Sequence, residues 1–536
     1  MLGDFNDLDA IRREFSWRVP KAFNIAQACC SSWAASHPEK IALIHVAANG
    51  DVQEWSYGDL ELASNRLANS LRARGIGRGD RVAILLPQCP EVLITHFAVY
   101  KLAAIAVPLF TLFGPDALAY RLADSSAKAI VTDGDSLEKL VSIQAKLPEL
   151  KEIYSTSNTA SPIRDLGQEM AAASKIFTPE PTQCEDPAMI IYTSGTTGPP
   201  KGALHAHQFL LGHLPAIELH HGGFPKANDC GWTPADWAWI GGLMDMAMPC
   251  LFYGVPLVSQ RLRKFDPEAA YGLIGRFKIR NLFMPPTALK LMQNTPVPRN
   301  VNIRSISSGG ESLGAEILAW SRDRLGAQIN EIYGQTECNL VICGAAALGG
   351  QRAGFMGQAV PGHSVAILDE FGQPAAPGTL GEIAVRRPDP VMFLGYWNRP
   401  GDTAAKFKGD WLCTGDLGIM DADGYFTFQG REDDVINSAG YRIGPTEIEN
   451  ALKGHRDVVM AAAIGFPDPV RGQIVKAFVV LRSGVQWDGL EEQLIALVAK
   501  QVSPHMAPKM IEQIVEMPLT ATGKIMRRSL RNRAIN

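Results

Sequence analysis

No run of about 18 uninterrupted apolar residues occurs in the chain, which argues against a membrane-spanning helix. Cysteine is sparse: the nine residues stand alone or as the pair Cys29–Cys30, without C-x-x-C or zinc-type spacing. This scatter excludes a disulfide framework and favours free thiols in a reducing compartment. The first residues are acidic and polar and lack the features of a signal or transit peptide. We therefore expect a cytoplasmic protein.

An excess of positive charge is also lacking. The net charge is -4, with 51 Lys and Arg against 55 Asp and Glu. Nucleic-acid-binding proteins present a basic surface to phosphates, so the composition argues against that class. A few well-placed cations are still enough to bind one nucleotide.

The order of elements predicts an α/β fold with more than one domain. The chain has 536 residues, more than the roughly 250–300 that one hydrophobic core usually serves. Strand-like runs such as Arg81–Leu86, Ala104–Pro108 and Ala127–Thr132 alternate with helical segments, which is typical of βαβ-layered sheets. Residues 357–429 read as a β-rich subdomain. We predict a large domain over residues 1–432 and a smaller α+β domain over residues 433–536.

The segment from Tyr192 to Gly202 is the most informative part of the chain. It follows a predicted buried strand and combines hydroxyl residues, glycines and a lysine. Glycines allow the backbone to approach a ligand closely, and N–H and hydroxyl groups can then surround phosphate oxygens. A flexible surface loop is the alternative, and the Walker order G-x-x-x-x-G-K-[ST] is absent. The candidate phosphate-binding residues are Thr193, Ser194, Gly195, Thr196, Thr197 and Lys201.

At this segment the chain resembles the adenylate-forming superfamily, which comprises acyl-CoA synthetases, adenylation domains of peptide synthetases, and luciferases. The resemblance covers nearly the whole chain, because further signature segments follow in family order. These are Ser308-Gly-Gly-Glu311, Tyr333-Gly-Gln-Thr-Glu337, Trp411-Leu-Cys-Thr-Gly-Asp416, Gly430-Arg-Glu-Asp-Asp434, Ser438-Ala-Gly-Tyr-Arg442 and Pro518-Leu-Thr-Ala-Thr-Gly-Lys524.

The resemblance implies a set of catalytic groups. Lys524 would bridge the attacking carboxylate and the α-phosphate of ATP, a charge that matters most in the transition state. Thr336 would contact the α-phosphate, and Glu337 would bind the Mg²⁺ of the nucleotide, with Thr196 as a second metal contact. The alternative for Lys524 is a solvated lysine in a basic tail.

A nucleotide site is implied by the same resemblance. Tyr333 would stack on adenine, Asp416 would accept hydrogen bonds from the ribose hydroxyls, and Arg431 would reach the ribose and phosphates. Core packing is the alternative for Tyr333, and a plain turn for Asp416. The remaining residues implied for ATP or AMP are Gly309, Gly310, Glu311, Gly334, Gln335 and Arg442.

The residues of the acyl and CoA sites are predicted less directly from the resemblance. Gly334 stands where acetyl-specific relatives carry a tryptophan, so an acid larger than acetate is expected. Trp237 and Trp239 are candidates for the walls of an apolar slot, with plain core packing as the alternative. No charged residue in these segments offers a partner for a second carboxylate, which favours a medium-chain, branched or aryl monocarboxylate. Family segments that face the CoA tunnel are matched at Ala288, Gly440 and Arg442, and the mobile small domain would turn at a hinge near Asp433.

We therefore expect an AMP-forming acyl-CoA synthetase that uses ATP, Mg²⁺ and CoA, the last as acceptor substrate. Its expected partners are small molecules, without nucleic acid or membrane insertion. A homodimer stays open, as do enzymes that acylate and deacylate Lys524. Two alternatives remain: a ligase that loads its adenylate onto a carrier protein, and a non-catalytic nucleotide-binding homologue.

Overall fold

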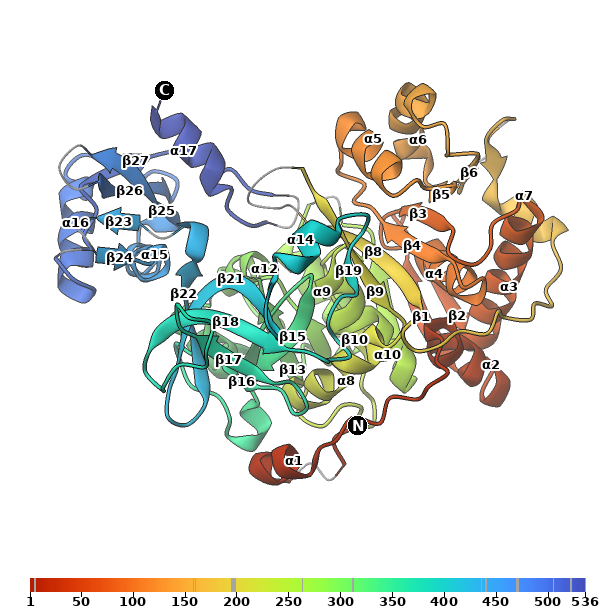
Figure 1. The fold of residues 1–536 in the computed structure, drawn as a ribbon, viewed down its shortest axis with the longest axis horizontal. Coiled ribbons are helices and arrows are strands. Elements are labelled where there is room, and N and C mark those ends of the chain that lie inside the picture. The colour runs from red at the N-terminus through yellow and green to blue at the C-terminus, as the bar shows by residue number, and fades with distance from the viewer. Residues whose placement is uncertain are drawn as a thin grey trace.

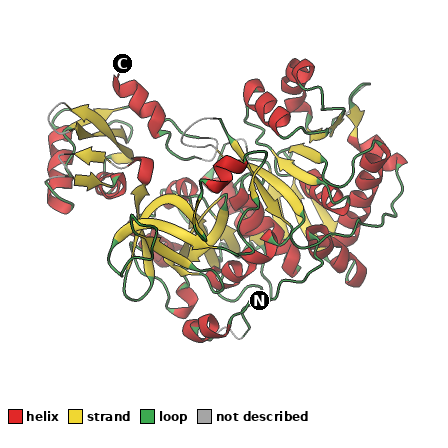
Figure 2. Ribbon diagram, viewed as in Figure 1, coloured by secondary structure: helices red, strands yellow, loops and turns green. Residues whose placement is uncertain are grey.

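The computed structural model describes residues 1–536 except 4–5, 158, 160, 194–198, 263, 311–312, 435, 439–440, 469–471, 505, 521–522 and 536. Of residues 433, 437, 441, 442 and 535 it describes the backbone only. A large body of layered helices and strands is followed by a small body that carries the C-terminus (Figure 1). Both bodies mix helix and strand (Figure 2). The expected fold class, α/β with a smaller α+β unit, is confirmed.

The first sheet of the large body has eight strands, and its central members are parallel. Its strands in spatial order are β19 (Gly395–Tyr396), β9 (Lys201–Ala206), β8 (Pro187–Thr193), β4 (Ile105–Pro108), β3 (Arg81–Leu85), β5 (Ala129–Thr132), β6 (Glu152–Ser155) and β7 (Arg164–Asp165). Helix α3 (Tyr57–Ala73) precedes β3, and the helices between the strands are α4 (Pro90–Lys101), α5 (Pro115–Asp124), α6 (Gly134–Ile143) and α7 (Leu166–Ala172).

Local sequence explains why these helices begin where they do. Ser56 caps α3 and forms a capping box with Asp59, so two backbone donors at the helix start are satisfied. Pro90 stands at the first position of α4, where the missing N–H costs no hydrogen bond. Almost every residue of α4 is buried, because the helix packs between α3 and the sheet.

The second sheet has fourteen strands and runs through the centre of the large body. In spatial order they are β17 (Val365–Leu368), β18 (Leu380–Arg386), β21 (Trp411–Met420), β22 (Tyr425–Arg431), β16 (Gly357–Ala359), β15 (Cys338–Cys343), β14 (Ile329–Gln335), β13 (Ser305–Gly309), β12 (Asn281–Phe283), β10 (Gly231–Trp232), β11 (Leu257–Gln260), β1 (Ile41–Val46) and β2 (Val52–Ser56), with β20 (Phe407–Lys408) beside β21. Parallel strands β10 to β14 thus continue into antiparallel strands, which include the β-rich stretch predicted from sequence.

The helices of this part connect or cover the large sheet. They are α8 (Phe209–His220), α9 (Ile240–Gly242), a π-helical turn η3 (Leu243–Ala247), α10 (Met248–Tyr253), α11 (Pro267–Phe277), α12 (Pro286–Gln293), α13 (Ala315–Trp320) and α14 (Pro400–Ala404). Two short helices, α1 (Leu8–Glu14) and α2 (Ser32–Ser36), precede β1. No helix in the described part of the chain is long and apolar enough to cross a bilayer.

The small body has its own five-stranded sheet and its own core. The strands are β24 (Tyr441–Ile443), β23 (Ile436–Ser438), β26 (Gly472–Leu481), β25 (Val458–Asp468) and β27 (Met510–Gln513), and the helices are α15 (Pro445–Lys453), α16 (Leu490–Gln501) and α17 (Arg527–Ile535). A 3₁₀ turn, η6 (Glu432–Asp434), joins it to β22. The Asp434 carboxylate lies 3.1 Å from Arg527 and 2.6 Å from Arg531, both on α17.

Candidate active site

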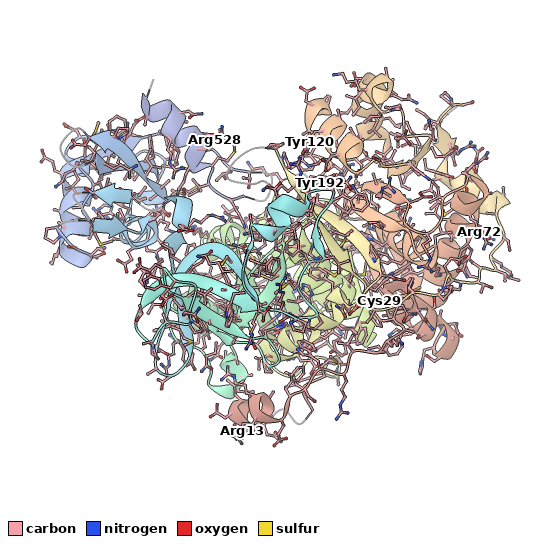
Figure 3. The ribbon with its side chains drawn as sticks, in the orientation of Figure 1. Arg13, Cys29, Arg72, Tyr120, Tyr192 and Arg528 are labelled. Atoms are coloured by element: carbon pink, nitrogen blue, oxygen red, sulfur yellow. The ribbon has the colours of Figure 1, made fainter. Side chains whose placement is uncertain are left out.

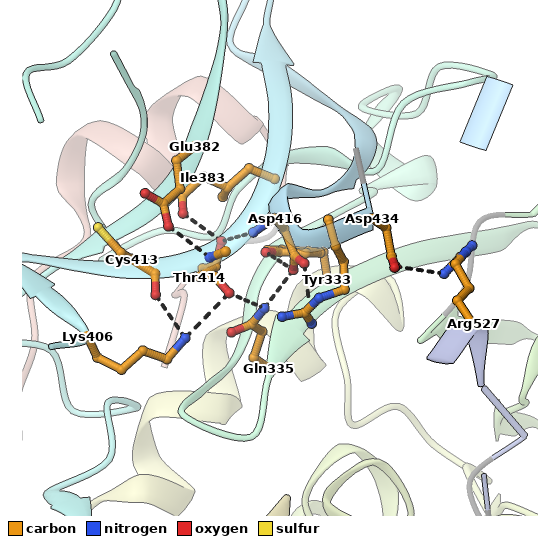
Figure 4. A network of polar contacts seen from close by, with 12 residues as sticks. Tyr333, Gln335, Glu382, Ile383, Lys406, Cys413, Thr414, Asp416, Asp434 and Arg527 are labelled. Atoms are coloured by element: carbon orange, nitrogen blue, oxygen red, sulfur yellow. Dashed lines mark hydrogen bonds and ion pairs between the residues drawn. The ribbon is translucent and has the colours of Figure 1, made fainter. Parts of the chain in front are cut away.

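A polar network surrounds Asp416 on β21 (Figure 4). Tyr333 Oη on β14 donates a hydrogen bond of 2.7 Å to Asp416 Oδ2, and Gln335 Nε2 donates another of 2.7 Å to the same atom. Arg431, at the end of β22, lies 3.6 Å from Asp416 Oδ1. Burial raises the pKa of Asp416, and the cation of Arg431, these two donors and Lys524 oppose that effect. The arrangement holds an acceptor ready for a polar ligand such as a ribose.

Lys524 comes from the far end of the chain to this network. Its turn is closed by hydrogen bonds between Thr520 and Lys524 and contains Gly523 at φ +83°, a conformation that favours glycine. A Cβ built on Gly310 would lie 3.8 Å from Lys524 Cε and 3.6 Å from Trp239. The structure therefore brings together Gly310, Trp239 and Lys524, which are widely separated in the sequence.

Glu337, four residues after Tyr333, is buried. Only 6% of its surface is exposed, and it accepts a hydrogen bond from the hydroxyl of Tyr396. Lys201 Nζ lies 5.2 Å from the centre of the Tyr396 ring and 2.9 Å from Asp402 Oδ1. Tyr396 and Asp402 were not among the residues predicted from sequence. The pairing of β19 with β9 brings Tyr396 close to Lys201. No local sequence pattern predicts this pairing.

The predicted phosphate loop is described at its two ends. Thr193 ends β8 and pairs with Lys201, the first residue of β9, so the ends of the loop are neighbours in the sheet. Tyr120 donates a hydrogen bond of 2.9 Å to the carbonyl of Pro200, and Tyr192 lies nearby (Figure 3). Ser194, Gly195, Thr196 and Thr197 lie outside the described residues.

The other predicted residues fall into two groups. Gly309 ends β13 against β14, where a Cβ would lie 2.6 Å from the carbonyl oxygen of Ile332, and Thr336 is half-buried in the turn between β14 and β15. Ala288 is buried in α12. Glu311 and Gly440 lie outside the described residues, and Asp433 and Arg442 are described by their backbone only, in η6 and β24.

The two candidate tryptophans differ in their surroundings. Trp237 is 1% exposed within the main core, whereas Trp239 is half-buried and packs against Phe283 with ring centres 5.4 Å apart. Gly334 faces β15: a Cβ on it would lie 2.1 Å from the backbone nitrogen of Leu340. Trp239 therefore lies next to Gly310, and the backbone around Gly334 leaves no room for a side chain there.

This fold, with a lysine of the small C-terminal body reaching the end of a strand in a large α/β body, is the fold of the adenylate-forming enzymes. Residues 30–397 match the family model of the AMP-binding enzymes, and residues 447–524 match that of the AMP-binding enzyme C-terminal domain. The chain belongs to the AMP-binding enzyme family.

Similar proteins agree with this assignment. The human mitochondrial acyl-coenzyme A synthetase ACSM4 is 34% identical over 99% of this chain and 93% of its own length. An acetyl-coenzyme A synthetase of Bacillus subtilis is 33% identical over 93% of this chain and 88% of its own. The crystal structure of the anthranilate CoA ligase AuaEII with anthranoyl-AMP has a TM-score of 0.88 and 26% identity, and covers 96% of this chain and 98% of the other. The expected class, an AMP-forming acid–thiol ligase, is confirmed.

Proposed function

We propose that the chain joins ATP and a medium-chain, branched or aryl monocarboxylate to acyl-AMP and pyrophosphate, and then transfers the acyl group to CoA with release of AMP. One observation carries the proposal: Lys524 reaches Gly310, against which Trp239 also lies, while its charge acts on Asp416. A cation beside the acid and the nucleotide offsets the repulsion of two anions in the first step. The similarity to acyl-CoA and anthranilate CoA ligases favours CoA over a carrier protein as acceptor.

The nucleotide roles belong to the same proposal. Asp416 would accept from the ribose hydroxyls, with Arg431 beside it. Tyr333 would present its ring to adenine, close to Gly309, Gly310, Glu311 and Gln335. The loop residues from Thr193 to Lys201 would surround the phosphates, and Thr336 would contact the α-phosphate. The buried hydrogen bonds to Asp416 support this assignment, because they fix an acceptor before any ligand arrives.

Glu337 fits a magnesium ion. Mg²⁺ prefers oxygen ligands and is usually held by one or two carboxylates together with substrate phosphates. Among the described residues no group of three or more His, Cys, Asp or Glu could form a metal cage, so Glu337 would share the ion with the nucleotide. When bound, the ion would neutralise phosphate charge, and Thr196 is proposed as its second contact. Tyr396 holds the Glu337 carboxylate in place through its hydroxyl.

The acyl and CoA sites stay proposals as well. Trp239, with Trp237 and Gly334, would bound the acyl slot, and Ala288, Gly440 and Arg442 would lie along the CoA path. The division into residues 1–432 and 433–536, with a hinge near Asp433, is supported by the separate sheet and core of the small body. Rotation there would exchange the faces of the small domain between the two half-reactions.

The proposals on cellular location, regulation and oligomeric state rest on fewer observations. A cytoplasmic location agrees with the nine cysteines, all of which are free. Acylation of Lys524 as a control of activity, and a homodimer, remain proposals. The exposed side chain of Lys524 agrees with the first of these.

Pyrophosphate release from Mg-ATP tests the proposal, measured with acids from acetate to decanoate and with branched and aryl acids, each with and without CoA. We expect CoA-dependent turnover that is greatest with medium-chain or aryl acids. Pyrophosphate release without CoA-dependent turnover would favour a carrier-protein acceptor. Absence of release with every acid would contradict the enzymatic proposal.

A further inference from the structure

His213, Asp245 and Asn339 form a buried polar trio in the large body. Asn339 Nδ2 on β15 donates to Asp245 Oδ1 on η3 at 2.5 Å and lies 2.9 Å from His213 Nε2 on α8. His213 is fully buried, and Asp245 and Asn339 keep 3% and 7% of their surface exposed. The main hydrophobic core surrounds them, with Leu243, Met244, Leu340 and Val341 among its members. A carboxyl group in such surroundings is costly unless its oxygens are hydrogen-bonded.

The trio adjoins the residues proposed for the acyl slot. Gly241 stands one helical turn before Asp245, and a Cβ on it would lie 2.9 Å from Phe283 and 3.3 Å from Trp239. Asn339 packs its backbone on Gly334, with its Cα 2.8 Å from a Cβ built there. Asp245 therefore follows a residue that lies against Trp239, and its hydrogen-bond partner Asn339 lies against Gly334.

The hydrogen bonds of the trio leave one carboxylate oxygen unused. Burial lowers the pKa of His213 to about 3, so the ring is neutral near pH 7. His213 Nδ1 lies 2.7 Å from the carbonyl oxygen of Phe209 and must carry the proton there, so Nε2 is an acceptor. Nε2 takes one N–H of Asn339 and has none to give to Asp245, 3.8 Å away. Within the described residues Asp245 thus has one donor, on Oδ1, and Oδ2 has none.

Two other buried carboxylates, those of Asp389 and Asp229, accept hydrogen bonds on both oxygens. Asp389 Oδ2 lies 2.7 Å from His363 Nδ1, and Asp389 Oδ1 accepts the backbone N–H of Val391 at 2.9 Å. Asp229 receives Arg304 on both oxygens. Asp245 differs from these two structural carboxylates, because its second oxygen lacks a protein donor and it adjoins the proposed slot.

We infer that Asp245 is a specificity-determining residue that receives a hydroxyl or amino group at the far end of the substrate acid. This inference rests on the proposed function, since it names the class of acid for the same slot. A hydroxyl or amino group donates to the free oxygen of Asp245, whereas a plain methyl terminus would leave that oxygen without a partner. Burial raises the pKa of the Asp245 carboxyl well above its usual range, and a hydroxyl group can pair with the second oxygen in either protonation state. The preferred substrate class is therefore a hydroxy- or amino-substituted monocarboxylate, aliphatic or aromatic.

Matched pairs of acids test the inference. Butyrate, hexanoate, octanoate and benzoate are each compared with hydroxy and amino derivatives substituted away from the carboxylate, by kcat/KM for pyrophosphate release in the full-length enzyme. For at least one scaffold we expect the substituted acid to exceed the plain acid by about tenfold or more, because sites built for a polar group discriminate strongly against its absence. In Asp245→Leu and Asp245→Asn that ratio should fall by about tenfold. In Asp389→Asn, which alters a buried aspartate of the same kind, the ratio should stay as in wild type.

The outcomes separate the two levels of the proposal. Turnover of plain acids with no preference for any substituted partner would overturn the role of Asp245 and leave the proposed function intact. Absence of pyrophosphate release with all acids would overturn the proposed function itself. If the Asp245 variants fail to fold, the kcat/KM ratios of the wild-type enzyme still test the inference. A second test is the dissociation constant of wild type for acyl-sulfamoyl adenosines with and without the hydroxyl group. Equal dissociation constants would contradict the inference.

Discussion

The hydroxyl of Tyr333 donates a hydrogen bond of 2.7 Å to Asp416, across strands β14 and β21 that are not neighbours in the sheet. The bond joins the two segments that the proposal assigns to adenine and to ribose. A ligand that uses both groups would find their relative position already fixed, which reduces the ordering required on binding.

Tyr333→Phe tests that relationship. The ring stays, but Asp416 loses a donor in a buried place, so we expect the KM for ATP to rise by about tenfold, as for a lost hydrogen bond to a charged group. Steady-state kinetics with ATP varied measures the effect. Tyr271→Phe, which removes a hydroxyl on α11 that donates to the Met292 carbonyl in α12, is the matched control and should leave KM unchanged. An unchanged KM in Tyr333→Phe would contradict the role of the pair.

Lys524→Ala should abolish adenylation and leave thioester formation from a supplied acyl-adenylate largely intact. Removal of a charge that stabilises the transition state typically costs about 10²–10³ in rate, so we expect at least that loss in pyrophosphate release. The two half-reactions are assayed separately. Arg528→Ala, an exposed cation four residues on, should change neither of them (Figure 3). Equal loss of both half-reactions in Lys524→Ala would show that its role is misassigned.

Gly334→Ala should destabilise the large domain. A Cβ would lie 2.1 Å from the backbone nitrogen of Leu340, so β15 would have to shift. Such overpacking typically costs about 1–3 kcal/mol. Thermal unfolding measures it, with Gly272→Ala as the control, because a Cβ there meets nothing within 4 Å. Equal melting temperatures of wild type and Gly334→Ala would contradict this prediction, because they would show that the β15 backbone shifts at no cost in stability.

Glu331 should make stability depend on pH. Burial raises its pKa to about 7, whereas in the unfolded chain it titrates near 4.5. Between these values the folded chain binds more protons than the unfolded one, so stability falls as pH rises from about 4.5 to 7 and stays low above that. Glu331→Gln should remove this loss, so its gain in melting temperature over wild type should grow from pH 5 to pH 8. The exposed Glu149→Gln should show no such trend, and a constant gain in Glu331→Gln would contradict the assignment.

The sequence predicted the elements whose signals are local. The strands near Arg81, Ala104 and Ala127 are formed as expected, and helices α4 and α5 lie between them along the chain. Helix α17 was missed because its apolar residues are few: Leu530 packs into a core cluster, and ion pairs of Arg527 and Arg531 add to this contact. Helix α15 was missed although Pro445 stands at its start.

The same limit applies to the site. Motifs that are contiguous in sequence named Tyr333, Glu337 and Asp416. Tyr396 and Asp245 could not be found in that way, because each acquires its partner from a segment at least 59 residues away. Neither residue stands in a recognisable pattern of its own, so only the folded chain reveals them.

The ion pairs of Asp434 with Arg527 and Arg531 would restrict the rotation proposed for the small domain. Arg431 is engaged with Asp416 on the side of the large body, and Asp434 is tied to α17 on the other, so Glu432 and Asp433 remain between two anchored ends. Each residue contributes two soft backbone dihedrals, so the pivot has very few degrees of freedom. We expect the small domain to rotate as a rigid body, so that Lys524 moves along an arc of nearly constant radius. Its return to the nucleotide would then be a rotation in one direction, without the search that closes a long flexible loop.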